Sequence, residues 1–136
     1  VIGSRTMGRA EKGALLPHQA FGNTLACFLM RLFWRHRYTD LGPFRAVRRE
    51  ALERLRMEDR NYGWTIEMQI KALQHGLRVR EIPVAYGRRV AGENKVSGNW
   101  KASAKAGWII LRTVFRYALR VNQDGSRPRI WARRSR

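Results

Sequence analysis

The chain has 136 residues, about the size of one domain, and 44% of them are hydrophobic, which is enough for a packed core. Its 28 lysines and arginines against 10 acidic residues give a formal net charge of +18. We therefore expect an anionic partner: nucleic acid, an anionic membrane or a phosphorylated substrate. The single cysteine excludes an intramolecular disulfide and a cysteine-rich zinc site.

The first half of the chain predicts a strand followed by a long helix. Val1 and Ile2 end a buried strand that runs into a loop at residues 3–5. A helix starts at Pro17 and is apolar on most faces as far as Trp34, which is typical of a buried helix or one lying against another hydrophobic surface. We expect Cys27 and the aromatic residues of this helix to belong to the core. The apolar stretch 25–34 is too short to span a bilayer, which needs roughly 20 residues.

The middle of the chain alternates between strand and helix patterns. The predicted elements are a short strand at 44–47, a short helix at 48–55, a helix at 64–75 ended by Gly76, and a strand at 77–84. This alternation indicates an α/β fold. Three short strands are too few for a complete sheet, and the chain begins in mid-strand without a methionine. We therefore expect a domain whose N-terminal part is missing.

The last predicted helix, residues 100–121, separates charge from apolar surface. Its basic arc and its apolar arc lie on different sides at 100° per residue. The apolar arc consists of Ile110, Leu111, Val114, Tyr117, Ala118 and Val121. We expect this arc to lie in the interface of an anionic membrane; the alternative is that it packs on the domain core. Residues 122–136 form a basic tail that we expect to be disordered.

Three polar loops carry the candidate chemistry. Arg5 follows the first strand, Asp40 opens a loop that contains Gly42, and residues 88–95 include further cations. Arginine suits bidentate contacts to phosphate and lysine acts as a point charge. Each of these residues also has a plain structural explanation, since Asp40 can form an Asx turn and the cations can be ordinary surface charges.

Five segments in order resemble a known enzyme family. They are GSR at 3–5, DLGPFRA at 40–46 (close to D-x-x-G-F-R-A), YGWTIEM at 62–68, EIPV at 81–84 and R-x-x-G-x-N-K at 89–95. The chain resembles the C-terminal half of a family 2 glycosyltransferase of the dolichyl-phosphate-mannose synthase-like type. Asn94 stands where that family usually has serine.

The resemblance implies a partial GT-A, Rossmann-like domain that lacks its N-terminal nucleotide-binding half. Residues 1–99 would be the C-terminal part of the catalytic domain, 100–121 an amphipathic helix and 122–136 the tail. The family's D-x-D motif, which would hold Mg²⁺ or Mn²⁺, is expected upstream of residue 1, so no metal ligand is expected in this chain. We expect the chain alone to be inactive.

The resemblance also implies roles for particular residues. Asp40 would be the catalytic carboxylate, and Arg5, Arg89 and Lys95 would bind donor or acceptor phosphates. Glu67 and Arg88 would support the active site; for Glu67 the alternative is a first-turn acid favoured by the helix dipole. If the acceptor is a phosphate, no base is needed and Asp40 would instead orient sugar hydroxyls.

The implied function is transfer of a sugar from a nucleotide-sugar donor to a lipid-phosphate acceptor, such as a polyprenyl phosphate, or to another membrane-associated acceptor. The protein would be peripheral at the cytoplasmic face of an anionic membrane. The alternative is a basic nucleic-acid-binding module, which the net charge alone suggests. Such modules usually carry a recognisable signature, and the sequence shows none. A non-catalytic membrane-associated scaffold is a third possibility.

Overall fold

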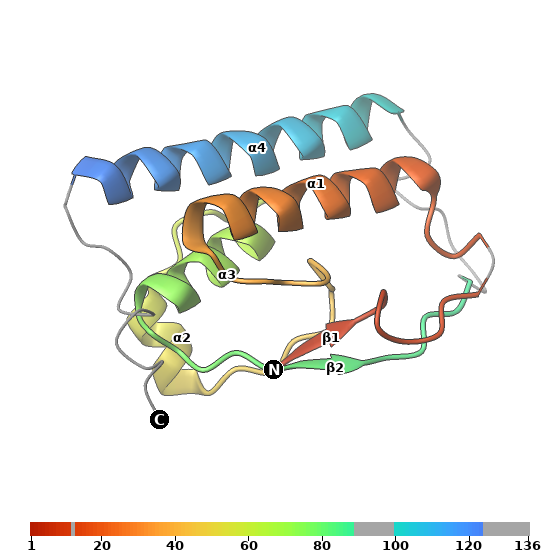
Figure 1. Ribbon diagram of the computed structural model, residues 1–136, viewed down its shortest axis with the longest axis horizontal. Helices are drawn as coiled ribbons and strands as arrows, with labels where there is room; N and C mark the ends of the chain where they lie inside the picture. Colours follow the sequence, from red (N-terminus) through yellow and green to blue (C-terminus); the bar gives the residue numbers. More distant parts are fainter. Residues whose placement is uncertain (12, 89–99, 124–136) are drawn as a thin grey trace.

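The computed structural model describes residues 1–11, 13–88 and 100–123 (Figure 1). The described residues form a mixed α/β structure. Its elements in chain order are β1 (Ile2–Ser4), α1 (Pro17–Trp34), α2 (Arg49–Leu55), α3 (Trp64–Gln74), β2 (Glu81–Pro83) and α4 (Trp100–Gln123). The predicted helices are all present, with ends within two residues of the prediction. Residues 124–136 of the predicted tail lie outside the described residues.

The helices form layers over a small sheet. Figure 1 shows α4 and α1 side by side and parallel, because both begin at the same end of the molecule. α3 lies beneath this pair and contacts both helices, and the strands lie on the far side of α1. The long connection between α1 and α4 therefore returns the chain to the starting end of α1.

The sheet is shorter than the sequence predicts. β1 pairs in parallel with β2, with Ile2 opposite Glu81 and Ser4 opposite Pro83. The predicted strand at 77–84 is regular only over Glu81–Pro83, and the strand predicted at 44–47 is reduced to an isolated bridge between Arg45 and Ile2. Strand length depends on the neighbours available for pairing, and the local pattern does not contain that information.

The core lies where α1, α3 and α4 meet. Met30 of α1, Ile66 and Ile70 of α3 and Val114 of α4 are fully buried, and Trp34 and Tyr117 pack against them.

This packing corrects the expectation for α4. Its apolar arc is part of the core: Val114, Tyr117 and Ala118 are buried, and Ile110 and Leu111 pack against the core cluster. The arc is covered by α1 and α3, so it is not available to lie in a membrane interface. Periodicity identified an apolar face correctly but does not reveal what covers it.

α1 also differs from expectation. Cys27 and Trp34 are buried as predicted, and burial raises the pKa of the Cys27 thiol to about 12, which keeps it protonated. Phe21 and Phe28, however, are 70% and 58% exposed, so they do not belong to the core. Among the described residues, no helix is both long enough and apolar enough to cross a bilayer.

Replacing Val114 by glutamate should unfold much of the chain, because it puts a carboxylate without a partner among Met30, Ile66 and Ile70. We expect a loss of about 4 kcal/mol or more in the free energy of unfolding, measured by urea denaturation. The matched change Leu119→Glu on the same helix should alter it by less than about 0.5 kcal/mol, since Leu119 is 62% exposed. Equal stability of the two variants would contradict the packing of α4.

Candidate functional site

The structure brings Arg5 and Asp40 together in a bidentate ion pair. Arg5 Nε donates to Asp40 Oδ2 at 2.8 Å and Nη2 donates to Oδ1 at 2.7 Å. The Arg5 backbone N–H also donates to Oδ2 at 2.8 Å. The Asp40 side chain is 0% exposed and that of Arg5 is 14% exposed. The two predicted residues thus form one unit in which the carboxylate is buried and the guanidinium reaches the surface.

Three polar side chains from different elements hold the Asp40 loop in place. Asn23 of α1 donates from Nδ2 to the Thr39 carbonyl at 3.3 Å, and Gln69 of α3 donates from Nε2 to the Asp40 carbonyl at 3.1 Å. Glu81 of β2 accepts from the Thr39 N–H at 3.0 Å and from the Asp40 N–H at 3.2 Å. The loop backbone is therefore satisfied by side chains, which fixes where the Asp40 carboxylate lies.

The residues that the sequence predicts for the site do not include Asn23, Gln69 or Glu81. A signal was present for each, because all three are polar residues inside apolar patterns. Asn23 interrupts the most apolar helix, Gln69 lies between Ile66 and Ile70, and Glu81 breaks the alternation of a predicted strand. Buried polar groups need hydrogen-bond partners, so such interruptions indicate a buried polar contact.

Close backbone contacts press this loop against β1. A Cβ atom on Gly42 would overlap the Gly3 carbonyl oxygen, and one on Gly3 would crowd Val84 and Phe44. Ser4 Oγ lies 2.7 Å from Thr39 Oγ1, which adds a hydroxyl pair between β1 and the loop. The glycines of the GSR and DLGPFRA segments therefore allow the approach that places Arg5 beside Asp40.

Arg45, in the same segment, has a structural role. Its guanidinium donates to the carbonyl oxygens of Leu41 at 3.2 Å, Gly42 at 3.0 Å and Thr65 at 2.8 Å. Burial lowers the pKa of Arg45 to about 10, and the carbonyl oxygens compensate the buried charge. Arg45 thereby ties the end of the loop to the first turn of α3.

A cavity of about 970 Å³ lies between α1, α4 and the Arg5 loop. Its apolar walls are formed by Phe21, Leu25, Leu41, Trp108, Ile110 and Leu111. Arg5 and His18 are among the residues that line it, whereas Asp40 is not. The cation of the ion pair therefore faces the cavity and the carboxylate lies behind it.

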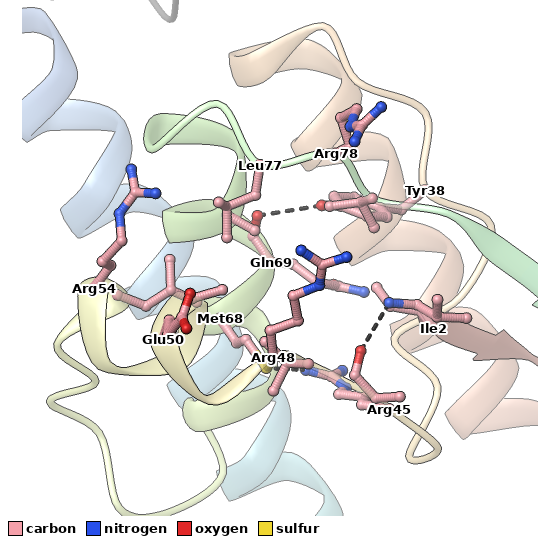
Figure 2. Close-up of a pocket in the computed structure, with 17 residues that line it drawn as sticks. Ile2, Tyr38, Arg45, Arg48, Glu50, Arg54, Met68, Gln69, Leu77 and Arg78 are labelled. Atoms are coloured by element: carbon pink, nitrogen blue, oxygen red, sulfur yellow. Dashed lines mark hydrogen bonds between the residues drawn. The ribbon is translucent and has the colours of Figure 1, made fainter.

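A second cavity, of about 630 Å³, lies between α2, α3 and the start of β1 (Figure 2). Figure 2 shows the Tyr38 hydroxyl donating to the Gln69 carbonyl, at 3.3 Å, on its wall. Arg48, Arg54 and Arg78 lie along it with Glu50. Neither Arg5 nor Asp40 lines this cavity, so it is separate from the predicted site.

The structure places Glu67 in a different cluster. Its carboxylate accepts from the Tyr117 hydroxyl at 2.8 Å and from the backbone N–H groups of Glu58 and Asp59, and pairs with Lys71 at 2.8 Å. Burial by itself would raise the pKa of Glu67, but these hydrogen bonds outweigh it and hold the pKa at about 2. These contacts tie α3 to α4, and none of them involves Arg5 or Asp40.

The remaining predicted cations are only partly described. Arg89 and Lys95 lie outside the described residues. The Arg88 backbone N–H donates to Glu11 Oε2 at 2.8 Å, beside the bridge between Ala10 and Tyr86. The Tyr86 ring lies 5.3 Å from the Arg5 guanidinium carbon, so this segment passes close to the ion pair. Among the described residues, no three His, Cys, Asp or Glu side chains come together as metal ligands would.

Comparison with known proteins finds relatives whose names describe glycosyltransferases. The chain is 44% identical over 75 residues to an uncharacterized glycosyltransferase of Mycobacterium tuberculosis, a match that covers 54% of this chain and 34% of that protein. The counterpart in Mycobacterium bovis gives the same figures. The chain has glycosyltransferase relatives. It is also 28% identical over 96 residues to an undecaprenyl-phosphate mannosyltransferase of Micrococcus luteus, covering 68% of this chain and 37% of that protein.

These similarities concern part of each relative, because the chain spans about a third of the length of the curated relatives it matches. No family model and no solved structure matches the chain. The relatives support the predicted transferase class and do not favour the nucleic-acid-binding alternative.

Glu67→Gln should remove a pH-dependent part of the stability. The folded-state pKa of about 2 lies below the ordinary 4.5, so the carboxylate stabilises the fold above pH 4.5 and this contribution is lost as the pH falls towards 2. We expect the parent chain to lose on the order of 2–3 kcal/mol over this interval and the variant to lose much less. Urea denaturation at a series of pH values measures this, and parallel curves for the two proteins would contradict it.

Proposed function

We propose that this chain is part of a glycosyltransferase that moves a hexose from a nucleotide-sugar donor to a lipid-phosphate acceptor, such as a polyprenyl phosphate. The observation that carries the proposal is the cavity between α1 and α4, which combines apolar walls with the Arg5 guanidinium. A lipid phosphate has the same two parts, an apolar chain and an anionic head. The relative whose name specifies undecaprenyl phosphate supports this acceptor class.

In this proposal Arg5 contacts the acceptor phosphate and Asp40 positions Arg5. The carboxylate is buried and accepts two hydrogen bonds from the Arg5 guanidinium and one from the Arg5 backbone N–H, so it is engaged by Arg5 and does not line the cavity. A phosphate acceptor is already an anion and needs no general base. Its oxygen forms the new bond to the sugar's anomeric carbon as the bond to the nucleoside diphosphate breaks, and the leaving group takes the electron pair.

Four further features of the proposed function rest on the sequence resemblance. They are membership of family 2, a GT-A catalytic domain, inactivity of the chain alone, and a location at the cytoplasmic face of a membrane. Arg89 and Lys95 would add cations for donor or acceptor phosphates. The divalent ion, Mg²⁺ or Mn²⁺, would stabilise the leaving diphosphate, with ligands outside the described residues of this chain.

Arg5→Lys in the full-length protein should lower the rate of mannose transfer to undecaprenyl phosphate on the order of 10²-fold, because lysine keeps the charge but not the bidentate fork. Asp40→Asn should lower both activity and stability, since it leaves a partly buried guanidinium without its carboxylate. If Asp40 acts only through Arg5, adding Asp40→Asn to Arg5→Ala should have little further effect on the rate.

The pH dependence of this transfer distinguishes the two roles of Asp40. A positioning role predicts that the residual activity of Asp40→Asn keeps the pH profile of the parent. Loss of the acidic limb of that profile in the variant would show that Asp40 is a general base and would contradict the assignment.

Gly107→Leu should fill the cavity without unfolding the chain. Gly107 lines the cavity from α4, and a Cβ atom there would meet no other atom within 4 Å. We expect the KM for undecaprenyl phosphate to rise about tenfold or more, because a side chain would occupy the space for the acceptor chain. The control Gly107→Ala should keep the parent's KM and add about 0.5–1 kcal/mol of stability. An unchanged KM in folded Gly107→Leu would exclude this cavity as the acceptor site.

A further inference from the structure

Large apolar side chains gather on the outer sides of α1 and α4. We call this surface the aromatic face and define it by its members: Phe21, Phe28, Leu32, Phe33, Trp108, Phe115 and Leu119. Their exposed fractions range from 36% for Phe33 to 70% for Phe21. Single exposed apolar residues are common, but seven on two neighbouring helices are more than isolated single residues and indicate an interaction site.

The two helices present these residues as one surface. α1 and α4 run side by side (Figure 1), and the Phe33 and Phe115 rings meet edge to face with centroids 5.8 Å apart. Phe21 and Trp108 line the same cavity further along the pair. On α4, Trp108, Phe115 and Leu119 lie within about 40° of one another at 100° per residue, and the centre of this group is about 120° away from the centre of the buried arc.

Cations flank the aromatic face on both helices. Arg31 on α1 and Lys105 and Arg112 on α4 are exposed, and Arg112 lies about 40° from Trp108 around the helix. The whole chain carries a formal net charge of +18. Apolar and aromatic side chains bordered by cations complement an anionic bilayer, in which acyl chains lie beneath a layer of negative headgroups.

We propose that the aromatic face docks on an anionic lipid surface, with α1 and α4 lying in the plane of the headgroups. This inference rests on the proposed function and identifies the surface through which the acceptor is reached. The cavity that Arg5 lines is bordered by Phe21 and Trp108, which also belong to the aromatic face. A lipid phosphate can therefore bring its head to Arg5 while its chain remains in the bilayer.

The first test compares binding of the full-length protein to phosphatidylcholine vesicles with and without phosphatidylglycerol, measured by co-sedimentation. The double variant Phe28→Ser/Leu119→Ser should bind the anionic vesicles at least tenfold more weakly than the parent. The control Phe44→Ser should bind as the parent does, since Phe44 is 55% exposed but lies on the loop beside β1. Equal binding by the double variant and the parent would overturn the proposal.

A second double variant tests how much the cations contribute to vesicle binding. Arg31→Gln/Arg112→Gln should weaken binding to the anionic vesicles by about fivefold per cation removed. Binding to vesicles of phosphatidylcholine alone should not change. Equal losses on both kinds of vesicle would show that the partner is not selected by its negative charge and would overturn the choice of an anionic surface.

Trp108 supplies a readout that does not depend on the double variant. Anionic vesicles should shift the tryptophan emission of the parent to the blue, and Trp108→Phe should remove most of this shift.

If the double variant instead turned a dimeric parent into a monomer with unchanged vesicle binding, a second copy would be the partner and the proposal would fail. Sugar transfer to a short-chain, water-soluble acceptor is measured in parallel without vesicles. Absence of this transfer in the parent counts against the proposed function. A variant that has lost only membrane docking should still carry out the transfer.

Discussion

The buried carboxylate of Asp40 is the constraint on which the rest of the site depends. A carboxylate with no exposed surface must be compensated, and Arg5 does so through its side chain and its backbone N–H. This fixes the end of β1 against the loop that follows Tyr38. The guanidinium of Arg5 then faces the cavity between α1 and α4, so the burial of the Asp40 carboxylate determines where this positive charge is placed.

α3 connects this arrangement to the rest of the fold. Gln69 binds the Asp40 loop, while Glu67, two residues earlier, binds Tyr117 of α4. Ile66 and Ile70, on the same helix, are fully buried in the core. Successive residues of α3 therefore anchor the ion-pair loop, the apolar core and the outer helix, and this sets the distance between α4 and the loop that bounds the cavity.

The sequence predicted the helices well because their signals are local. Pro17 marks the start of α1, and Gly76, with a φ of 64°, follows the end of α3 where the pattern places it. The strands were predicted less well, since the length of β2 depends on its pairing with distant β1. The motifs and the end of the first strand made Asp40 and Arg5 candidates for the site, but their contact and the burial of Asp40 depend on Asn23, Gln69 and Glu81 from three other elements.

The residue pattern of α4 shows that the helix has apolar stripes, but it does not predict which stripe is buried. The sequence contains two apolar stripes on this helix, and periodicity predicts the longer one as the membrane-facing side. It is in fact the inner one, because α1 and α3 bury Val114 and Tyr117. The shorter stripe of Trp108, Phe115 and Leu119 is exposed and lies among cations, where a helical-wheel view assigns it to the polar side.

The parallel pairing of α1 with α4 has a consequence for the order of folding. The two helices lie side by side, yet 65 of the 136 residues lie between the end of α1 and the start of α4. Contacts between distant segments form late, because closing the long connection costs entropy before the contacts compensate for it. During synthesis, the apolar side of α1 that α4 covers is left without its partner until α4 has been made. A nascent chain therefore exposes an apolar surface on α1 that chaperones can bind. Pairing with α4 buries this surface and ends its exposure to chaperones.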